Sequence, residues 1–215
     1  LVAKLGLNKK GVLALCKNKP FVSKSGIPSK SLEGFLFPDT YFFQEDDSPE
    51  DVLTQIIEEY QKNISDDLRT RADEMGFSEL EMITLASIIE GEAIYDTERS
   101  IISGVYHNRL KLGMKLQADP TIQYIIKDSP RRLLNRDLKI NSPYNTYLYD
   151  GLPPGPVNNP GKASILAALY PDKNDYLFFV ARGDGYHTFS KTKEEHNRAK
   201  KAFQKVRRKY RKKRG

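Results

Sequence analysis

Hydrophobic residues recur every three to four positions in three stretches of the chain, which predicts three amphipathic helices. The first begins at Ser48, a capping residue followed by Pro49 at the first helical position. The second begins at Ser78, and Glu81 completes a capping box with it. The third is expected over residues 97–112. These helices make up the centre of the chain.

Apolar and aromatic residues at both ends of the chain lack helical spacing. Residues 32–43 contain Pro and Gly and predict an edge strand or an irregular extended segment. Residues 176–181 and 186–189 flank the turn Arg182-Gly183-Asp184-Gly185 and predict a β-hairpin. A capping box of Thr192 with Glu195 then opens a last helix that runs into a basic tail. The expected fold class is α+β: a mixed helical domain with a hairpin and short strands.

Residues 114–160 show little periodicity and are rich in Pro, Asn, Asp and Tyr. A loop region of that length inside a compact domain is usually functional. Asn159-Pro160 is expected to begin a short helix that ends before Pro171.

The net charge of +7 is concentrated at the C-terminus, where residues 198–215 hold 11 Lys or Arg and no acid. The remaining 24 basic residues face 28 acidic ones, so the body carries a net −4. We consider two interpretations of the tail. It contacts an anionic polymer, lipid head groups or nucleic acid, or it is simply a solvated helix end or a disordered tail. The acidic body argues against a nucleic-acid-binding protein.

Several classes of site are excluded or unsupported. The single cysteine excludes an internal disulfide and a cysteine-based zinc site. The three histidines fall at no metal-ligand spacing, and neither a nucleophile elbow nor a glycine-rich phosphate loop occurs. We therefore expect no metal and no cofactor. No window approaches 18 uninterrupted apolar residues, and the chain opens with Leu1, which we interpret as an excised fragment whose targeting segment lies upstream.

Glu90 is the strongest single candidate for acid–base chemistry. It lies four residues after Ala86 and seven after Ile83, and therefore shares their helix face. A carboxyl group held against apolar side chains has a raised pKa, as a general acid near neutral pH requires. The alternatives are an exposed acid at a fraying helix end and a structurally paired acid.

The tyrosine-rich loop at residues 141–156 suggests a carbohydrate ligand. Aromatic faces stack on sugar C–H surfaces, and Asn amides bond to hydroxyl and acetamido groups. The alternative is that these tyrosines only fill a long loop.

An ordered series of motifs resembles the YceG-like (MltG) endolytic murein transglycosylase family. The motifs span about residues 32–197 and are Leu32-Glu33-Gly34-Phe35-Leu36-Phe37-Pro38-Asp39-Thr40-Tyr41, Leu85-Ala86-Ser87-Ile88-Ile89-Glu90, Asn108-Arg109-Leu110, Gly113-Met114-Lys115-Leu116-Gln117-Ala118-Asp119-Pro120-Thr121, Tyr144-Asn145-Thr146-Tyr147, Gly151-Leu152-Pro153-Pro154-Gly155-Pro156 and Gly185-Tyr186-His187-Thr188-Phe189.

The resemblance implies a catalytic domain over residues 32–197 and, before it at 1–31, a linker with the trailing part of a LysM-like region. Residues 198–215 remain a basic helix end or tail. The resemblance also implies a transmembrane anchor in the full-length protein, an extracytoplasmic or periplasmic catalytic domain, peptidoglycan glycan strands as partner, and a possible association with peptidoglycan synthases.

The resemblance further assigns the site. Glu90 matches the family's catalytic acid and precedes Asn108 by 18 residues; Glu92 is a supporting acid. The residues expected to contact substrate are Glu92, Asn108, Gln117, Asp119, Thr121, Tyr144, Asn145 and Tyr147. The implied reaction cleaves the MurNAc–GlcNAc bond and leaves a 1,6-anhydro end, which needs one acid rather than the two of most glycosidases. The alternatives are a hydrolase on the same fold and a non-catalytic cell-wall-binding module.

Overall fold

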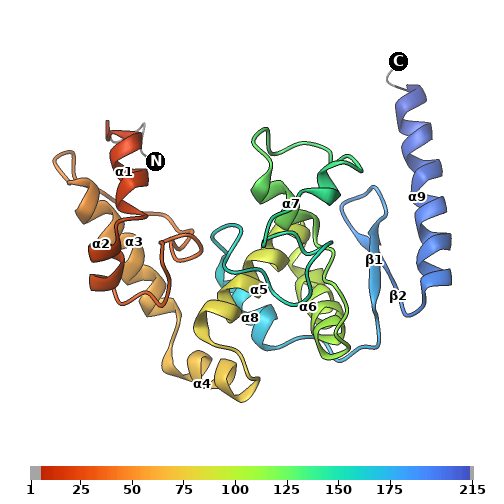
Figure 1. The fold of residues 1–215 in the computed structure, drawn as a ribbon, viewed down its shortest axis with the longest axis horizontal. Helices are drawn as coiled ribbons and strands as arrows, with labels where there is room; N and C mark the ends of the chain where they lie inside the picture. The colour runs from red at the N-terminus through yellow and green to blue at the C-terminus, as the bar shows by residue number, and fades with distance from the viewer. Residues whose placement is uncertain (1–5, 214–215) are drawn as a thin grey trace.

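The computed structural model describes residues 6–213 as a mostly helical domain with one small antiparallel hairpin (Figure 1). The predicted hairpin is confirmed, but the other short strands are not found between residues 6 and 213, where residues 32–43 are irregular. The helices are α1 (Lys9–Leu15), α2 (Lys19–Lys24), α3 (Pro49–Asn63), α4 (Asp66–Glu74), α5 (Glu79–Glu92), α6 (Asp96–Lys111), α7 (Asp119–Ile125), the short 3-10 helix η1 (Asp137–Lys139), α8 (Lys162–Leu169) and α9 (Lys193–Lys213); the strands are β1 (Phe178–Ala181) and β2 (His187–Ser190).

The N-terminal helices α1 to α3 pack around the irregular segment 32–37. Phe35 is completely buried and meets Tyr60 of α3 edge to face, with ring centroids 5.1 Å apart. Val12 of α1 and Val22 of α2 belong to the same hydrophobic core. The described residues before 32 are therefore packed against the domain rather than separate from it.

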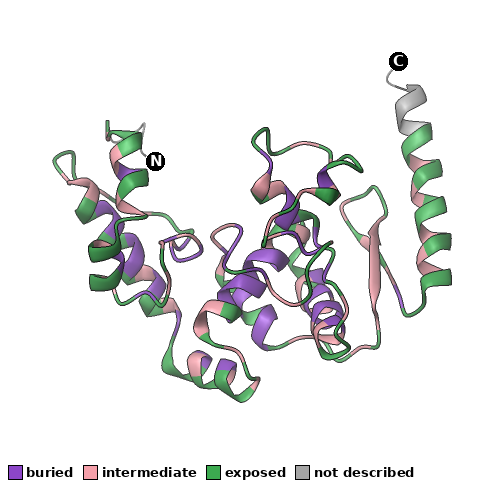
Figure 2. Cartoon of the chain, viewed as in Figure 1, coloured by how far each residue is buried: buried purple, intermediate pink, exposed green. Residues whose placement is uncertain are grey.

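Helix α5 is the centre of the molecule, as the purple ribbon in Figure 2 shows. Its capping box is present, with Ser78 accepting from the Glu81 N–H and the Glu81 carboxylate accepting from the Ser78 N–H. Every residue from Met82 to Ile89 is buried, so the helix is covered on all sides rather than along one stripe. Its main neighbours are α8, α7 and α6.

The hairpin and α9 form the C-terminal side of the molecule (Figure 1). Phe178 pairs with Ser190 and Ala181 with His187. Helix α9 packs along both strands, and its outer surface is exposed (Figure 2). The Thr192–Glu195 capping box is present. The C-terminal tail is helical to Lys213, which supports a helix end over a disordered tail. Of the two predicted terminal segments, residues 1–5 and 214–215 lie outside the described residues. No helix among residues 6–213 has the length and hydrophobicity to cross a membrane.

Candidate active site

A cavity of about 370 Å³ lies where the end of α5 and the start of α7 face the hairpin and α9. Its polar lining combines two carboxylates with several cations. The lining residues are Glu92, Arg109, Leu116, Gln117, Asp119, Tyr147, Phe178, Phe179, Val180, Ala181, His187, Lys193, His196, Lys200 and Phe203. Four of the predicted site residues therefore meet here: Glu92, Gln117, Asp119 and Tyr147.

Glu92, the last residue of α5, points into this cavity and is otherwise surrounded by protein. Its Oε1 accepts a hydrogen bond of 3.0 Å from the hydroxyl of buried Tyr106. Burial raises the pKa of Glu92 to about 7, and the negative charge of Asp119 acts in the same direction. The Tyr106 hydrogen bond and the charge of Arg109 act against this rise in pKa. Glu92 is thus an acid that is substantially protonated near neutral pH.

Asp119 begins α7 and is held by the loop that follows η1. The Tyr147 hydroxyl donates a hydrogen bond of 2.5 Å to Asp119 Oδ1. The two segments are joined again by the Gln117 N–H, which donates to the Thr146 carbonyl at 3.0 Å. Gln117 has a left-handed φ of +49°, so the backbone turns sharply just before α7. This local geometry brings Gln117, Asp119 and Tyr147 to the same cavity.

Thr121 and Asn145 are completely buried, which differs from their expected role in direct substrate contact. The Thr121 hydroxyl bonds to that of Thr146 at 2.9 Å. The Asn145 amide donates to the carbonyls of Leu138 and Ile140. Both side chains make hydrogen bonds inside the protein, and these bonds help to position the segments that carry Asp119 and Tyr147.

Asn108 and Tyr144 lie away from the cavity. The Asn108 amide donates to the carbonyls of Asn174 and Tyr176, at 2.8 and 3.0 Å, and ties α6 to the chain that leads into β1. Tyr144 packs on Tyr124 with ring centroids 4.8 Å apart. Neither residue lines the cavity that contains Glu92.

Glu90 has a different environment from the apolar one expected for it. Its carboxylate pairs with Arg99 at 3.2 Å and accepts from the Ser164 hydroxyl at 2.7 Å and the Gly161 N–H at 3.2 Å. About a third of the side chain is exposed, and it does not line the cavity. These contacts link α5, α6 and the start of α8, and the catalytic role expected for Glu90 stays a prediction.

Arg109 and the pair Glu98–His187 were not predicted as site residues, yet they shape the cavity. Arg109 is buried and donates to the carbonyls of Leu116 and Leu177, each at 2.6 Å. The Glu98 carboxylate, also buried, accepts from the His187 N–H at 3.0 Å and lies 2.9 Å from its Nδ1. These contacts fix the hairpin against α6 and so define one wall of the cavity.

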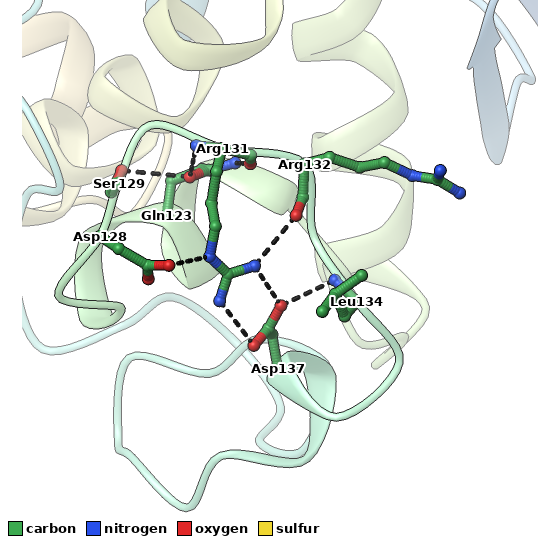
Figure 3. Close-up of polar contacts among 7 residues, drawn as sticks. All are labelled: Gln123, Asp128, Ser129, Arg131, Arg132, Leu134 and Asp137. Carbon is green, nitrogen blue, oxygen red and sulfur yellow. Dashed lines mark hydrogen bonds and ion pairs between the residues drawn. The ribbon is translucent and has the colours of Figure 1, made fainter.

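A second polar network holds the loop between α7 and η1 (Figure 3). The guanidinium of Arg131 binds both oxygens of Asp137, at 2.7 and 2.9 Å, and Asp128 at 2.6 Å. Gln123 of α7 bonds to the backbone of Arg131 on the same loop (Figure 3). This network lies outside the cavity and connects α7 to η1 through the loop between them. In the described part of the chain, no three His, Cys, Asp or Glu side chains are grouped to hold a metal ion.

Comparison with known proteins decides the family. The model of the YceG-like family matches residues 3–202, nearly the whole chain. The chain belongs to the YceG-like family. The crystal structure of a yceG-like protein from Listeria monocytogenes superposes with a TM-score of 0.82 at 38% identity, covering 92% of this chain and 69% of that one.

Two relatives of this YceG-like chain are named endolytic murein transglycosylase. The protein from Bacillus subtilis (strain 168) is 44% identical over 176 residues, which is 80% of this chain and 48% of the relative. The protein from Streptococcus pneumoniae serotype 2 is 33% identical over 173 residues, which is 78% of this chain and 31% of the relative. The chain thus spans half or less of the length of the curated relatives it matches.

Proposed function

We propose that this YceG-like chain carries the catalytic site of an endolytic murein transglycosylase, and that Glu92 is its general acid. The observation that carries the proposal is a carboxyl group with a pKa of about 7 at the end of a buried helix, facing a cavity large enough for a sugar. The names of the relatives support the same reaction.

The reaction uses one carboxyl group twice. Protonated Glu92 donates its proton to the oxygen that links MurNAc to GlcNAc, and the bond between that oxygen and MurNAc C1 breaks. The Glu92 carboxylate then accepts the proton of the MurNAc C6 hydroxyl, whose oxygen bonds to C1. The product is a 1,6-anhydro end, and Glu92 is protonated again for the next cycle. The side chain of Asp119 lines the same cavity, where it can stabilise the positive charge that develops at C1.

Substitution of each acid in turn distinguishes Glu92 from Glu90. We expect Glu92→Gln to lower cleavage of uncrosslinked glycan strands by at least about 100-fold with little change in thermal unfolding, because the amide cannot donate the proton. We expect Glu90→Gln to retain most activity and to unfold at a lower temperature, because it weakens the contact with Arg99. A folded Glu90→Gln protein without activity would assign the reaction to Glu90 instead.

Mass spectrometry of the product ends identifies the reaction class. Anhydro-MurNAc ends that disappear in Glu92→Gln are expected. Hydrolysis is the second candidate, because the carboxylate of Asp119 lies close enough to Glu92 to influence its pKa and could activate a water molecule. Reducing MurNAc ends that disappear in Asp119→Asn would establish the hydrolase and reject the transglycosylase.

The proposed setting follows from the family. We infer an extracytoplasmic site of action on nascent glycan strands, a membrane anchor in the full-length protein, and peptidoglycan synthases as neighbours. We also propose that residues 1–31 continue a LysM-like region of the full-length protein. A tagged full-length protein that fractionates with membranes and resists protease added to spheroplasts, in which extracytoplasmic domains are accessible, would contradict the extracytoplasmic location.

A further inference from the structure

One face of α9 gives the cavity a cationic wall. Lys193, His196, Lys200 and Phe203 recur at three- and four-residue spacing and all line the cavity. Neither Glu194 nor Glu195, the acids at the start of α9, lines the cavity, and Glu195 accepts from the N–H groups of Lys191 and Thr192. The carboxylates of the cavity come from α5 and α7, and its lysines come from α9.

Lys200 is the cation of this wall with no other role in the fold. Among residues 6–208, whose side chains the structure describes, it makes no ion pair or hydrogen bond, whereas Lys193 lies over the Phe178 ring at 5.2 Å. Arg109, the third cation, donates to backbone carbonyls. His196 is neutral at neutral pH, because burial and the nearby charges of Lys193 and Lys200 lower its pKa to about 4.

No ion pair or hydrogen bond joins Lys193 or Lys200 to Glu92, whose charged neighbours include Asp119 and Arg109. A solvated lysine that lines a cavity without an internal partner is suited to an anionic group of a ligand. The sugar backbone of a glycan strand is uncharged, but the peptides attached to MurNAc carry carboxylates.

We propose that Lys200, assisted by Lys193, forms a subsite for a carboxylate of the peptide carried by the MurNAc next to the cleaved bond. The inference rests on the proposed function and adds a specificity element to the same cavity. Helix α9 thus selects strands that still carry acidic peptides, while Glu92 cuts the sugar backbone.

The test compares one substrate in two charge states. Peptide-bearing glycan strands are digested before and after their carboxylates are converted to amides, and kcat/KM is measured for wild type, Lys200→Gln and Lys201→Gln. Lys201 is the matched control, because it is the next residue on α9 and does not line the cavity. Wild type and Lys201→Gln are expected to prefer the charged strands about three- to fivefold, the ratio a partly exposed ion pair supplies. Lys200→Gln is expected to cut both substrates at nearly the same rate.

Binding gives a readout that does not depend on cleavage. In the Glu92→Gln background, co-sedimentation with charged strands should weaken on addition of Lys200→Gln and stay unchanged with Lys201→Gln. The subsite would be overturned if Lys200→Gln and Lys201→Gln preferred charged strands equally, or if wild type cut amidated strands as fast as charged ones. Either result would leave the transglycosylase proposal intact. Absence of cleavage by wild type, with the charge-dependent binding retained, would reject the reaction and keep the subsite.

Discussion

At the scale of the residue, two neighbours act on Glu92 in opposite directions. The carboxylate of Asp119 repels a second negative charge and raises the pKa of Glu92. The hydroxyl of Tyr106 donates to the Glu92 carboxylate and lowers that pKa by stabilising the charged form. The pKa of about 7 is therefore adjustable in both directions without touching Glu92 itself.

This balance predicts opposite shifts in the pH profile of kcat/KM. On the proposed mechanism cleavage needs protonated Glu92, so activity should fall as the pH rises through about 7 in the wild type. In Asp119→Asn the raising charge is gone, and the fall should move to lower pH. In Tyr106→Phe the lowering hydrogen bond is gone, and the fall should move to higher pH. Identical midpoints in all three proteins would show that another group controls the alkaline limb.

The sequence places an acid at the end of a buried helix, and the family match and the spacing to Asn108 favour Glu90 over Glu92, whereas the cavity favours Glu92. Two residues apart on a helix differ by about 200° in direction, so the two side chains enter different surroundings. The helix face that Glu90 shares with Ile83 and Ala86 does not tell the surroundings of the two acids apart, because α5 is buried on all sides from Met82 to Ile89. The decisive contacts, Arg99 for Glu90 and Tyr106 for Glu92, come from another helix.

At the scale of the element, the buried carboxylate of Glu98 is one of the groups that join the hairpin to α6. Glu98→Ala leaves the His187 N–H without its acceptor in a buried site, and we expect the free energy of unfolding to fall by about 2 kcal/mol. Because the hairpin lines the cavity, KM for glycan strands should rise as well. Thermal unfolding and steady-state kinetics check this.

Exposed Glu194 on α9 provides the control for the hairpin experiment. Glu194→Ala should change the free energy of unfolding by less than about 0.5 kcal/mol and leave KM unchanged. A Glu98→Ala protein as stable as Glu194→Ala would mean that the strand pairing and α9 hold the hairpin without Glu98.

The elements that the sequence predicted well are those with capping signals and strong local patterns. Helices α5 and α9 begin where their capping boxes indicated, and the hairpin follows its Gly-rich turn. Helix α7 was not predicted, because seven residues give too little periodicity and its N-cap Ala118 makes no side-chain capping bond. The cavity-lining face of α9 is visible in the spacing of Lys193, His196 and Lys200, but only the position of the hairpin shows that it faces Glu92.

At the scale of the whole molecule, the N-terminal segment is hydrogen-bonded to the loop that precedes α8, and this loop also contacts Glu90. The N–H groups of Gly34 and Leu36 both donate to the Asn159 side chain, at 2.8 and 3.2 Å. Two residues later, the Gly161 N–H donates to the Glu90 carboxylate. Segments far apart in the chain thus meet at the Glu90 end of α5.

Gly34, in the N-terminal segment that contacts the loop before α8, has no room for a side chain. Its φ is +90°, and a Cβ there would lie 2.3 Å from Cγ of Pro156. Gly34→Ala should therefore combine backbone strain with overpacking and lower the free energy of unfolding by about 2–4 kcal/mol. Gly76→Ala is the matched control, because Gly76 has a φ of +78° but no atom within 4 Å of the added methyl group.

The control should lose only the backbone contribution, about 1 kcal/mol. Chemical denaturation of both variants separates the two effects, since the difference between them measures the overpacking against Pro156 and Ile83. If α1 to α3 and the catalytic helices unfold together, Gly34→Ala should lower one common transition. A Gly34→Ala protein that unfolds in two steps would instead show that the N-terminal helices detach from α5 before the site itself is lost.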